Sequence, residues 1–281
     1  MAKTASELVS DIGGLITLPD VYLKIDRLVN DPKSSTTDIA KAVSQDPSFT
    51  ARLLRVANSP LYKVSSTIDS VPKAISIIGV TQIRSLALSM SVSKCFAGLP
   101  NELVSMENFW RHSLLCALAA RLLAKTARRC DPDTLFTAGL LHDIGELIIF
   151  NRMPEQAKQA LEMVLDSQDE MAVNEAELAV IGFDHADVGG ALAVRWHLPP
   201  VLTECIAYHH NLAGAMQHPR ETALVHLANV IALMAEVDTL ELDDVEPIDP
   251  AAWEKTGLDL SVVEPAVRAV QTEIVEIEQL F

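Results

Sequence analysis

Cysteine is scarce in this sequence of 281 residues. The four cysteines are scattered along the chain and form no C-x-x-C pair: Cys95, Cys116, Cys130 and Cys205. This spacing argues against a disulfide framework and against a structural zinc knuckle. Reduced thiols are typical of proteins in a reducing compartment, and we therefore expect a cytoplasmic protein.

Long apolar runs are also lacking. The N-terminus has no apolar signal segment, and the most apolar stretch, residues 138–150, is interrupted by His142, Asp143 and Glu146. A helix that crosses a bilayer needs about 20 predominantly apolar residues in succession, and a secretory signal needs a continuous apolar core. The sequence therefore predicts a soluble protein with no signal peptide and no membrane span.

Basic residues are outnumbered, because 22 Lys and Arg stand against 38 Asp and Glu and give a formal net charge of −16. Non-specific binding to nucleic acid or to an anionic membrane relies on basic patches. We therefore expect neither nucleic acid nor a membrane among the partners. The simplest interpretation of the acidity is that it favours solubility.

Apolar residues are abundant. They make up 49% of the chain, which is enough for a sizeable core. Most stretches between Pro and Gly follow a helical period, and no sustained strand-like alternation occurs. Helix starts are marked by Asp46-Pro47 and Asp131-Pro132, in which Asp caps the helix and Pro takes its first position. The sequence predicts an all-α fold.

Residues 97–100 (AGLP) are the best candidate for a domain boundary, since they are small and follow no period. We expect a helical subdomain over residues 1–98 and a second over residues 99–240. Residues 241–281 should form an acidic loop and a C-terminal helix that packs on the body. The apolar residues of that helix recur at helical spacing: Val263, Val267, Val270, Ile274 and Ile277.

The densest chemical signal lies in residues 139–145 (GLLHDIG), where His142 and Asp143 stand among apolar residues of a predicted helix. Burying two polar side chains is costly unless a partner satisfies them. A metal ion would do so, because imidazole and carboxylate suit Zn, Fe, Mn or Ni. The pair alone also fits a buried, hydrogen-bonded couple without an ion.

Further histidines lie on other predicted helices. His112 shares the apolar face of a helix near residues 106–129, His185 follows a helix-start signal, and His209-His210 end the helix of residues 201–208. In a helical bundle, ligands that project inward from different helices are the usual construction of a metal centre. His226 fits either a core histidine or a partner that orients a ligand.

Several strings together resemble the HDOD family over most of the chain. They are Leu18-Pro19, residues 46–59 (DPSFTARLLRVANS), Ala74-Ile75 with Ile78-Gly79, Trp110-Arg111-His112-Ser113, residues 139–145, Asp184-His185 with Val188-Gly189, Trp196-His197-Leu198-Pro199, His209-His210 and His226-Leu227-Ala228-Asn229. The resemblance implies an N-terminal helical bundle plus an HD-domain-like helical bundle, and a role in bacterial signal transduction.

The HD-like half of such proteins is related to HD and HD-GYP metal-dependent phosphohydrolases. The resemblance implies a set of metal ligands spread over the second half of the chain: His112, His142, Asp143, His185, His209, His210 and Asn229. In the catalytic relatives the last of these positions is an aspartate. Because a neutral amide binds a divalent ion more weakly than a carboxylate does, we expect one ion (Fe, Zn, Mn or Ni) at partial occupancy.

Three further positions depart from the catalytic pattern. Glu146 stands where HD-GYP relatives carry a lysine that meets a substrate phosphate, and an anion there should repel such a substrate. Asn108 stands where those enzymes can place a glutamate ligand. Residues 211–213 (NLA) replace the Gly-Tyr-Pro signature after the histidine pair.

The preferred hypothesis is a non-catalytic regulatory protein with a degenerate HD metal site and protein partners in a signalling pathway. The alternative is a metal-dependent phosphohydrolase acting on nucleotides or cyclic dinucleotides, which would make a nucleotide the ligand. A bound but idle ion that braces the bundle is a third reading. A hydrogen-bonded cluster without an ion remains open beside these three.

Overall fold

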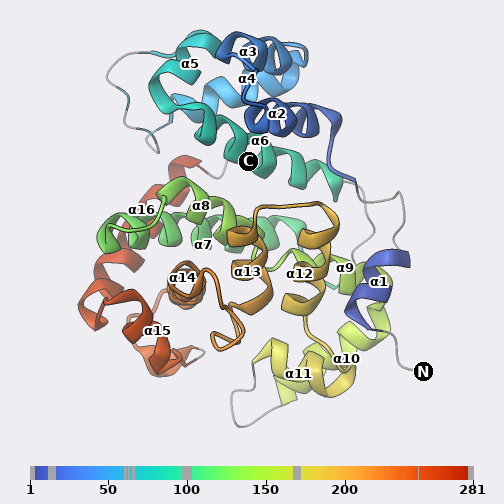
Figure 1. Ribbon diagram of the computed structural model, residues 1–281. Helices are drawn as coiled ribbons and strands as arrows, with labels where there is room; N and C mark the ends of the chain where they lie inside the picture. The colour runs from blue at the N-terminus through green and yellow to red at the C-terminus, as the bar shows by residue number, and fades with distance from the viewer. Residues whose placement is uncertain are drawn as a thin grey trace. The chain divides into compact units, whose positions relative to one another are not determined.

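The structure, a computed structural model, describes residues 4–11, 17–59, 62, 64, 67–96, 103–166, 172–245 and 247–277 (Figure 1). Every regular element in these ranges is a helix, which confirms the predicted all-α fold. The chain divides into two compact units. Unit 1 comprises residues 1–15 and 98–270, and unit 2 comprises residues 16–97 and 271–281. The boundary predicted at residues 97–100 lies outside the described residues.

Unit 2 contains five helices in the described part of the chain: α2 (Asp20–Asn30), α3 (Thr36–Ser44), α4 (Pro47–Ala57), α5 (Val71–Ile78) and α6 (Val80–Cys95). Helix α2 packs against α6 and α3, and Ile25 of α2 is fully buried. The start of α4 follows the sequence prediction, because the side chain of Asp46 accepts the backbone N–H of Phe49 and Pro47 occupies the first turn.

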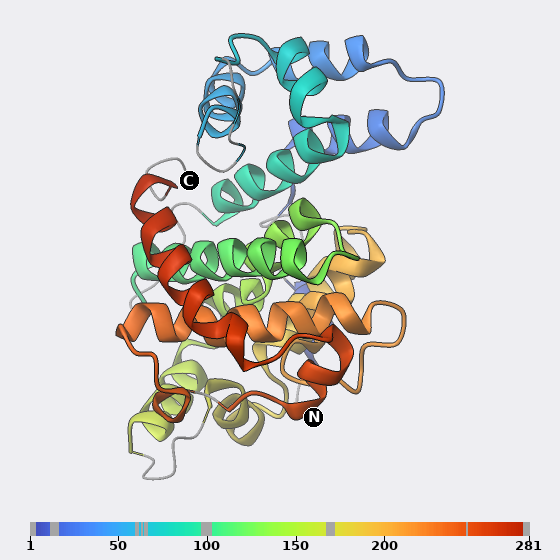
Figure 2. The ribbon, with the colours of Figure 1, turned by 90° about the vertical axis from the view of Figure 1, so that its left-hand side faces the viewer.

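Unit 1 contains the remaining elements of the described ranges. They are α1 (Ala5–Asp11), α7 (Met106–Ala127), α8 (Pro132–Leu141), α9 (Ile144–Arg152), α10 (Pro154–Asp166), α11 (Val173–Val180), α12 (His185–Arg195), α13 (Pro200–Tyr208), α14 (Pro219–Val237), η1 (Leu242–Asp244), α15 (Pro250–Thr256), η2 (Leu260–Val262) and α16 (Val263–Ile277), whose last residues count with unit 2. Helix α7 packs along α8 and α14, and Figure 2 shows α7 and α14 running side by side.

The C-terminal helix predicted from the apolar spacing is present as α16, and four of the predicted apolar residues are buried: Val263, Val267, Val270 and Ile274. Ahead of it, the acidic segment after α14 contains the short helix η1 and then α15. No single described helix combines the length and apolarity needed to cross a bilayer. One pair, Val71–Ile78 with Val80–Val92, meets that test by length and composition, with a bend of 115° between its halves.

The helix predicted to contain His142 and Asp143 is wrong in one respect, because it is interrupted at this pair. Helix α8 ends at Leu141 and α9 begins at Ile144, and Asp143 has φ −95° and ψ 13°. Consecutive residues of a continuous helix point about 100° apart. The break between α8 and α9 therefore allows His142 and Asp143 to contact each other, with His142 Nε2 2.9 Å from Asp143 Oδ2.

Two glycines on either side of this break let neighbouring helices approach closely. A Cβ at Gly139 would lie 2.8 Å from the backbone oxygen of Cys116 on α7, and a Cβ at Gly145 would lie 2.0 Å from that of His185 on α12. Real side chains do not tolerate such distances. Glycine at these two positions therefore brings α7 and α12 against the His142-Asp143 junction.

Candidate metal centre

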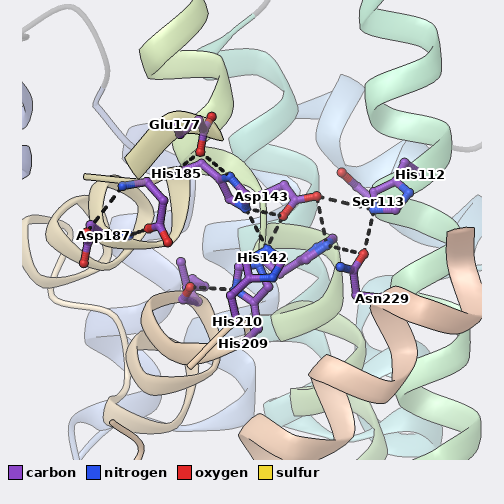
Figure 3. A network of polar contacts seen from close by, with 12 residues as sticks. His112, Ser113, His142, Asp143, Glu177, His185, Asp187, His209, His210 and Asn229 are labelled. Carbon is purple, nitrogen blue, oxygen red and sulfur yellow. Dashed lines mark hydrogen bonds and ion pairs between the residues drawn. The ribbon is translucent and has the colours of Figure 1, made fainter. Parts of the chain in front are cut away.

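Asp143 lies at the centre of a cluster of imidazoles that come from four separate segments of unit 1 (Figure 3). Its Oδ2 is 2.9 Å from Nε2 of His142 and 3.3 Å from Nε2 of His112. Its Oδ1 is 3.3 Å from Nε2 of His209 and 3.4 Å from Nε2 of His185. The carboxylate therefore has two imidazoles on each oxygen.

The two other predicted site residues complete the cluster. The amide Oδ1 of Asn229 lies 3.0 Å from Nε2 of His112 and 3.2 Å from Nε2 of His142. On the opposite side, Nε2 of His210 lies 3.1 Å from Nε2 of His185. The structure thus brings together all seven residues that were predicted as metal ligands. That they bind a metal stays a prediction.

The histidines are held by hydrogen bonds on the outer side of each ring. Nδ1 of His142 donates to the carbonyl of Gly139 at 2.8 Å, and Nδ1 of His209 donates to the carbonyl of Ile206 at 2.9 Å. A carbonyl oxygen can only accept, so the proton is on Nδ1 in both contacts. Each ring therefore turns its Nε2 towards Asp143, as metal-binding histidines do.

Two carboxylates that the sequence analysis missed hold the other two rings. Nδ1 of His185 lies 2.7 Å from Oε2 of the buried Glu177, and Nδ1 of His112 lies 3.0 Å from Oε2 of Glu236. Glu236 stands seven residues after Asn229 on α14, two turns along the same face, and this spacing could have revealed it. Glu177 lies on α11, and nothing in its spacing from His185 marks it.

His226 is a buried residue that supports the cluster from α14. Its Nδ1 donates to the carbonyl of His209 at 2.9 Å, and its Nε2 accepts the backbone N–H of Asp249 at 3.0 Å. Of its two predicted roles, the orienting one matches these contacts. The remaining histidines stand apart from the cluster: His197 is exposed, and His218 is half-buried before α14.

The cluster raises the pKa of three imidazoles. Burial lowers the pKa of His112, but hydrogen bonds to Asp143 and Glu236 outweigh it and raise the pKa to about 10. Burial likewise opposes protonation of His142 and His185. The pKa of His142 is nevertheless raised well above its usual range by Asp143, and the pKa of His185 by its carboxylate neighbour Glu177 and by Asp143.

The same cluster lowers the pKa of the other members. Burial would raise the pKa of Asp143, but the surrounding imidazoles, His142 above all, hold it well below its usual range. Burial and the neighbouring His210 lower the pKa of His209 to about 3. The pKa of His210 is also well below its usual range, because of burial and of His185. Asp143 is thus ionised, and the His209-His210 pair is neutral.

Two buried atoms in this network have no hydrogen-bond partner: Oδ1 of Asp143 and Nε2 of His209. They lie 3.3 Å apart, and both are acceptors, because the proton of the neutral His209 ring is on Nδ1. Leaving a buried polar atom without a partner costs about 1–3 kcal/mol. A divalent cation would satisfy both atoms, and carboxylate and imidazole are suitable ligands for Zn, Fe, Mn or Ni. The residues present therefore fit a metal ion.

A pocket of about 490 Å³ opens onto the cluster. Five members of the cluster line it: His112, Asp143, His185, His210 and Asn229. It is also lined by Asn108 and Glu146, which depart from the catalytic pattern, and by Glu236, which the sequence analysis missed. No lysine or arginine is among the described residues that line it. Burial and the nearby Asp143 raise the pKa of Glu146 to about 8. The pocket thus offers carboxyl groups where a phosphate would need cations.

Comparison with known proteins agrees with this architecture. The model of the HDOD domain family matches residues 15–212. A crystal structure of an HDOD domain protein of unknown function from Geobacter sulfurreducens is 26% identical and superposes with a TM-score of 0.79, covering 99% of this chain and 97% of that one. A Shewanella amazonensis protein whose name proposes a phosphohydrolase is 24% identical, with a TM-score of 0.76 over 99% and 98% of the two chains, and shares the fold.

A sequence relative is an uncharacterized protein of Treponema pallidum, 26% identical over 214 residues. The match covers 76% of this chain and 41% of the relative, so the chain spans less than half of that protein's length.

Proposed function

The chain belongs to the HDOD domain family, and from this premise we propose that it is a regulatory signalling protein whose unit 1 binds a divalent metal ion but has no phosphohydrolase activity. The observation that carries the proposal is the pairing of a carboxylate and histidine cluster with an acidic pocket. The cluster has two unsatisfied buried acceptors, which favours a cation. The pocket above it has no lysine or arginine among its described lining residues.

Phosphohydrolases need positive groups around the phosphate, since charge on its oxygens must be stabilised in the transition state. A bound ion would supply one such charge by polarising a phosphate oxygen. In this chain Glu146, three residues after Asp143, lines the pocket instead of a cation, and Glu236 lines it beside His112. Neither carboxyl group supplies the positive charge that an anionic substrate needs, so a bound ion would not be enough to recruit a phosphate ester.

Activity assays test the absence of turnover. The purified chain would be loaded with Mn²⁺, Fe²⁺ or Zn²⁺ and given linear and cyclic mononucleotides and cyclic dinucleotides. We expect no hydrolysis above that of a matched variant with His142→Ala and Asp143→Ala. Turnover that is present in the natural chain and lost in this variant would contradict the proposal and support the phosphohydrolase, the alternative that the nearly complete histidine and aspartate set favours.

A cation introduced at the pocket tests why an anion is excluded. Glu146→Lys is expected to raise affinity for inorganic phosphate or adenosine monophosphate about 10-fold, because a carboxyl group is replaced by an attracting positive charge. The matched control is Glu155→Lys, which makes the same change at an exposed position of α10 and should leave phosphate affinity unchanged. Titration calorimetry would measure both. Equal affinity in the natural chain and in Glu146→Lys would count against the electrostatic explanation.

Metal binding is expected to release protons. The pKa of His185 is raised well above its usual range, and an imidazole must give up the proton on the nitrogen that binds a metal. Affinity for Mn²⁺ should therefore fall as the pH is lowered from about 8 to about 6. Calorimetry in two buffers with different ionisation enthalpies would count the protons released. An identical binding enthalpy in both buffers would show that no proton leaves.

We also assign to this chain a partner protein in a signalling pathway, on the strength of the family.

A bound ion should stabilise unit 1, because its ligands would come from the start of α9, from α12 and from the end of α13. Chelation should then lower the melting temperature of the protein, because a ligand that binds only the folded state stabilises it.

A further inference from the structure

The cluster consists of two unlike halves that share Asp143 (Figure 3). The Asn229 half contains His112, His142 and Asn229 around Oδ2, and the His209 half contains His185, His209 and His210 around Oδ1. In each half, donor atoms that could hold an ion lie within 4.8 Å of one another. The two halves differ in how far hydrogen bonds already satisfy them.

In the Asn229 half, every inward-facing atom has a partner. Oδ1 of Asn229 is 3.0 Å from Nε2 of His112 and 3.2 Å from Nε2 of His142. Oδ2 of Asp143 is 2.9 Å from Nε2 of His142. All three distances are within hydrogen-bonding range, and none of these atoms is left without a partner. Nothing in this half requires a cation.

In the His209 half, two of the inward-facing atoms lack such partners. Oδ1 of Asp143 and Nε2 of His209 are buried and make no hydrogen bond. Nε2 of His185 and Nε2 of His210 face each other at 3.1 Å, and a single proton is all that can lie between two ring nitrogens. Four atoms that could bind an ion therefore lie within 4.8 Å of one another, and hydrogen bonds leave two of them unsatisfied.

We propose that the metal ion is held by Oδ1 of Asp143 and by Nε2 of His185, His209 and His210, while His112, His142 and Asn229 keep their hydrogen bonds. This inference rests on the proposed metal binding and adds the location of the ion. One carboxylate and three imidazoles form a four-ligand set of the kind that Zn²⁺ and Co²⁺ accept. His210 lines the 490 Å³ pocket and a neighbouring one of about 880 Å³, so the ion can enter from either side.

The surroundings of the His209 half also hold its ligands in place. Glu177 contacts both Nδ1 and the backbone N–H of His185, at 2.7 and 2.8 Å. The ring of His209 is fixed by the carbonyl of Ile206, and its own carbonyl accepts from His226. Hydrogen bonds of this kind to ligand groups orient them and raise metal affinity.

His209 and His142 make a matched pair for the test. Both side chains are fully buried, both donate from Nδ1 to the carbonyl three residues earlier, and both turn Nε2 to Asp143. They differ in the half to which they belong. His209→Gln should lower Co²⁺ affinity at least about 100-fold, and His142→Gln should change it less than about 5-fold. Circular dichroism would establish that both variants fold.

X-ray absorption of the natural chain with one equivalent of Co²⁺ gives a readout that does not depend on any variant, with three imidazoles expected around the ion. Loss of Co²⁺ binding in His142→Gln, or equal losses in both variants, would overturn the location of the ion and leave the proposed metal binding intact. X-ray absorption that shows two imidazoles, together with Co²⁺ binding that survives His209→Gln, would also overturn the location of the ion. Absence of Co²⁺ binding to the natural chain would overturn both.

Discussion

Asp143→Asn is expected to abolish metal binding, with a loss of affinity of at least about 1000-fold. Asp143 is the only carboxylate that contacts four of the imidazoles in the described cluster. Asparagine keeps the shape of the side chain but removes the negative charge, and a neutral amide is a poor ligand for a transition metal. Titration calorimetry with Mn²⁺ or Co²⁺ would measure the change.

Asp133→Asn is a suitable control for this substitution. Asp133 makes an ion pair with Arg121 at 3.2 Å between α8 and α7, in the same unit and with both side chains largely buried. Its loss removes one carboxylate charge from the same unit without touching the cluster, so metal affinity should not change. Retention of natural affinity by Asp143→Asn would show that the carboxylate does not bind the ion.

Gly145→Ala is expected to destabilise the protein by about 3 kcal/mol, the largest effect on stability that we anticipate from a single added methyl group. The new Cβ would lie 2.0 Å from the carbonyl oxygen of His185 and 2.7 Å from the backbone nitrogen of Gly189. Both obstacles are backbone atoms of α12, so the helix itself must move. Because α12 carries His185, the displacement should also weaken metal binding.

Gly189→Ala adds the same methyl group on the opposite side of this contact and serves as the comparison. There the nearest atom is the side-chain methyl Cγ2 of Ile206 at 2.7 Å, which can move by a change of side-chain rotamer. A smaller loss, about 1 kcal/mol, is expected. Chemical denaturation of both variants would measure the free energy of unfolding. A loss in Gly145→Ala no greater than in Gly189→Ala would contradict the account of close helix packing.

Helix starts and the membership of the cluster could be predicted from the sequence because they depend on local signals. Asp184 caps α12 directly before His185, and the histidines stand at helix ends or on apolar faces. The resemblance to HDOD proteins then selected which of them belong together. Their arrangement around a single carboxylate could not be read from spacing, since it results from the packing of α7, α8, α9, α12, α13 and α14.

Two features of the site depend on the three-dimensional structure. The helix break between α8 and α9 falls inside a continuous apolar stretch, and periodicity alone does not mark it. Glu177 reaches His185 from another helix, so no sequence rule connects the two residues. The contrast between the Asn229 half and the His209 half likewise depends on which atoms have hydrogen bonds, and only coordinates reveal that.

The presence of an acidic pocket over a cluster of potential metal ligands supports the proposed role of unit 1 as a sensor or scaffold. The carboxyl groups of Glu146 and Glu236 offer phosphate no positive charge, while the inward-facing histidine nitrogens and Asp143 favour a cation. The family supports the proposed regulatory role, and the chemistry of these residues supports the proposed absence of hydrolysis.

Elemental analysis of the chain purified without an affinity tag, before and after exposure to Mn²⁺, Fe²⁺ and Zn²⁺, tests metal binding most directly. We expect one divalent ion per chain after supplementation, and none in Asp143→Asn. Absence of any ion from the natural chain at every stage would contradict the account and leave a hydrogen-bonded cluster in its place.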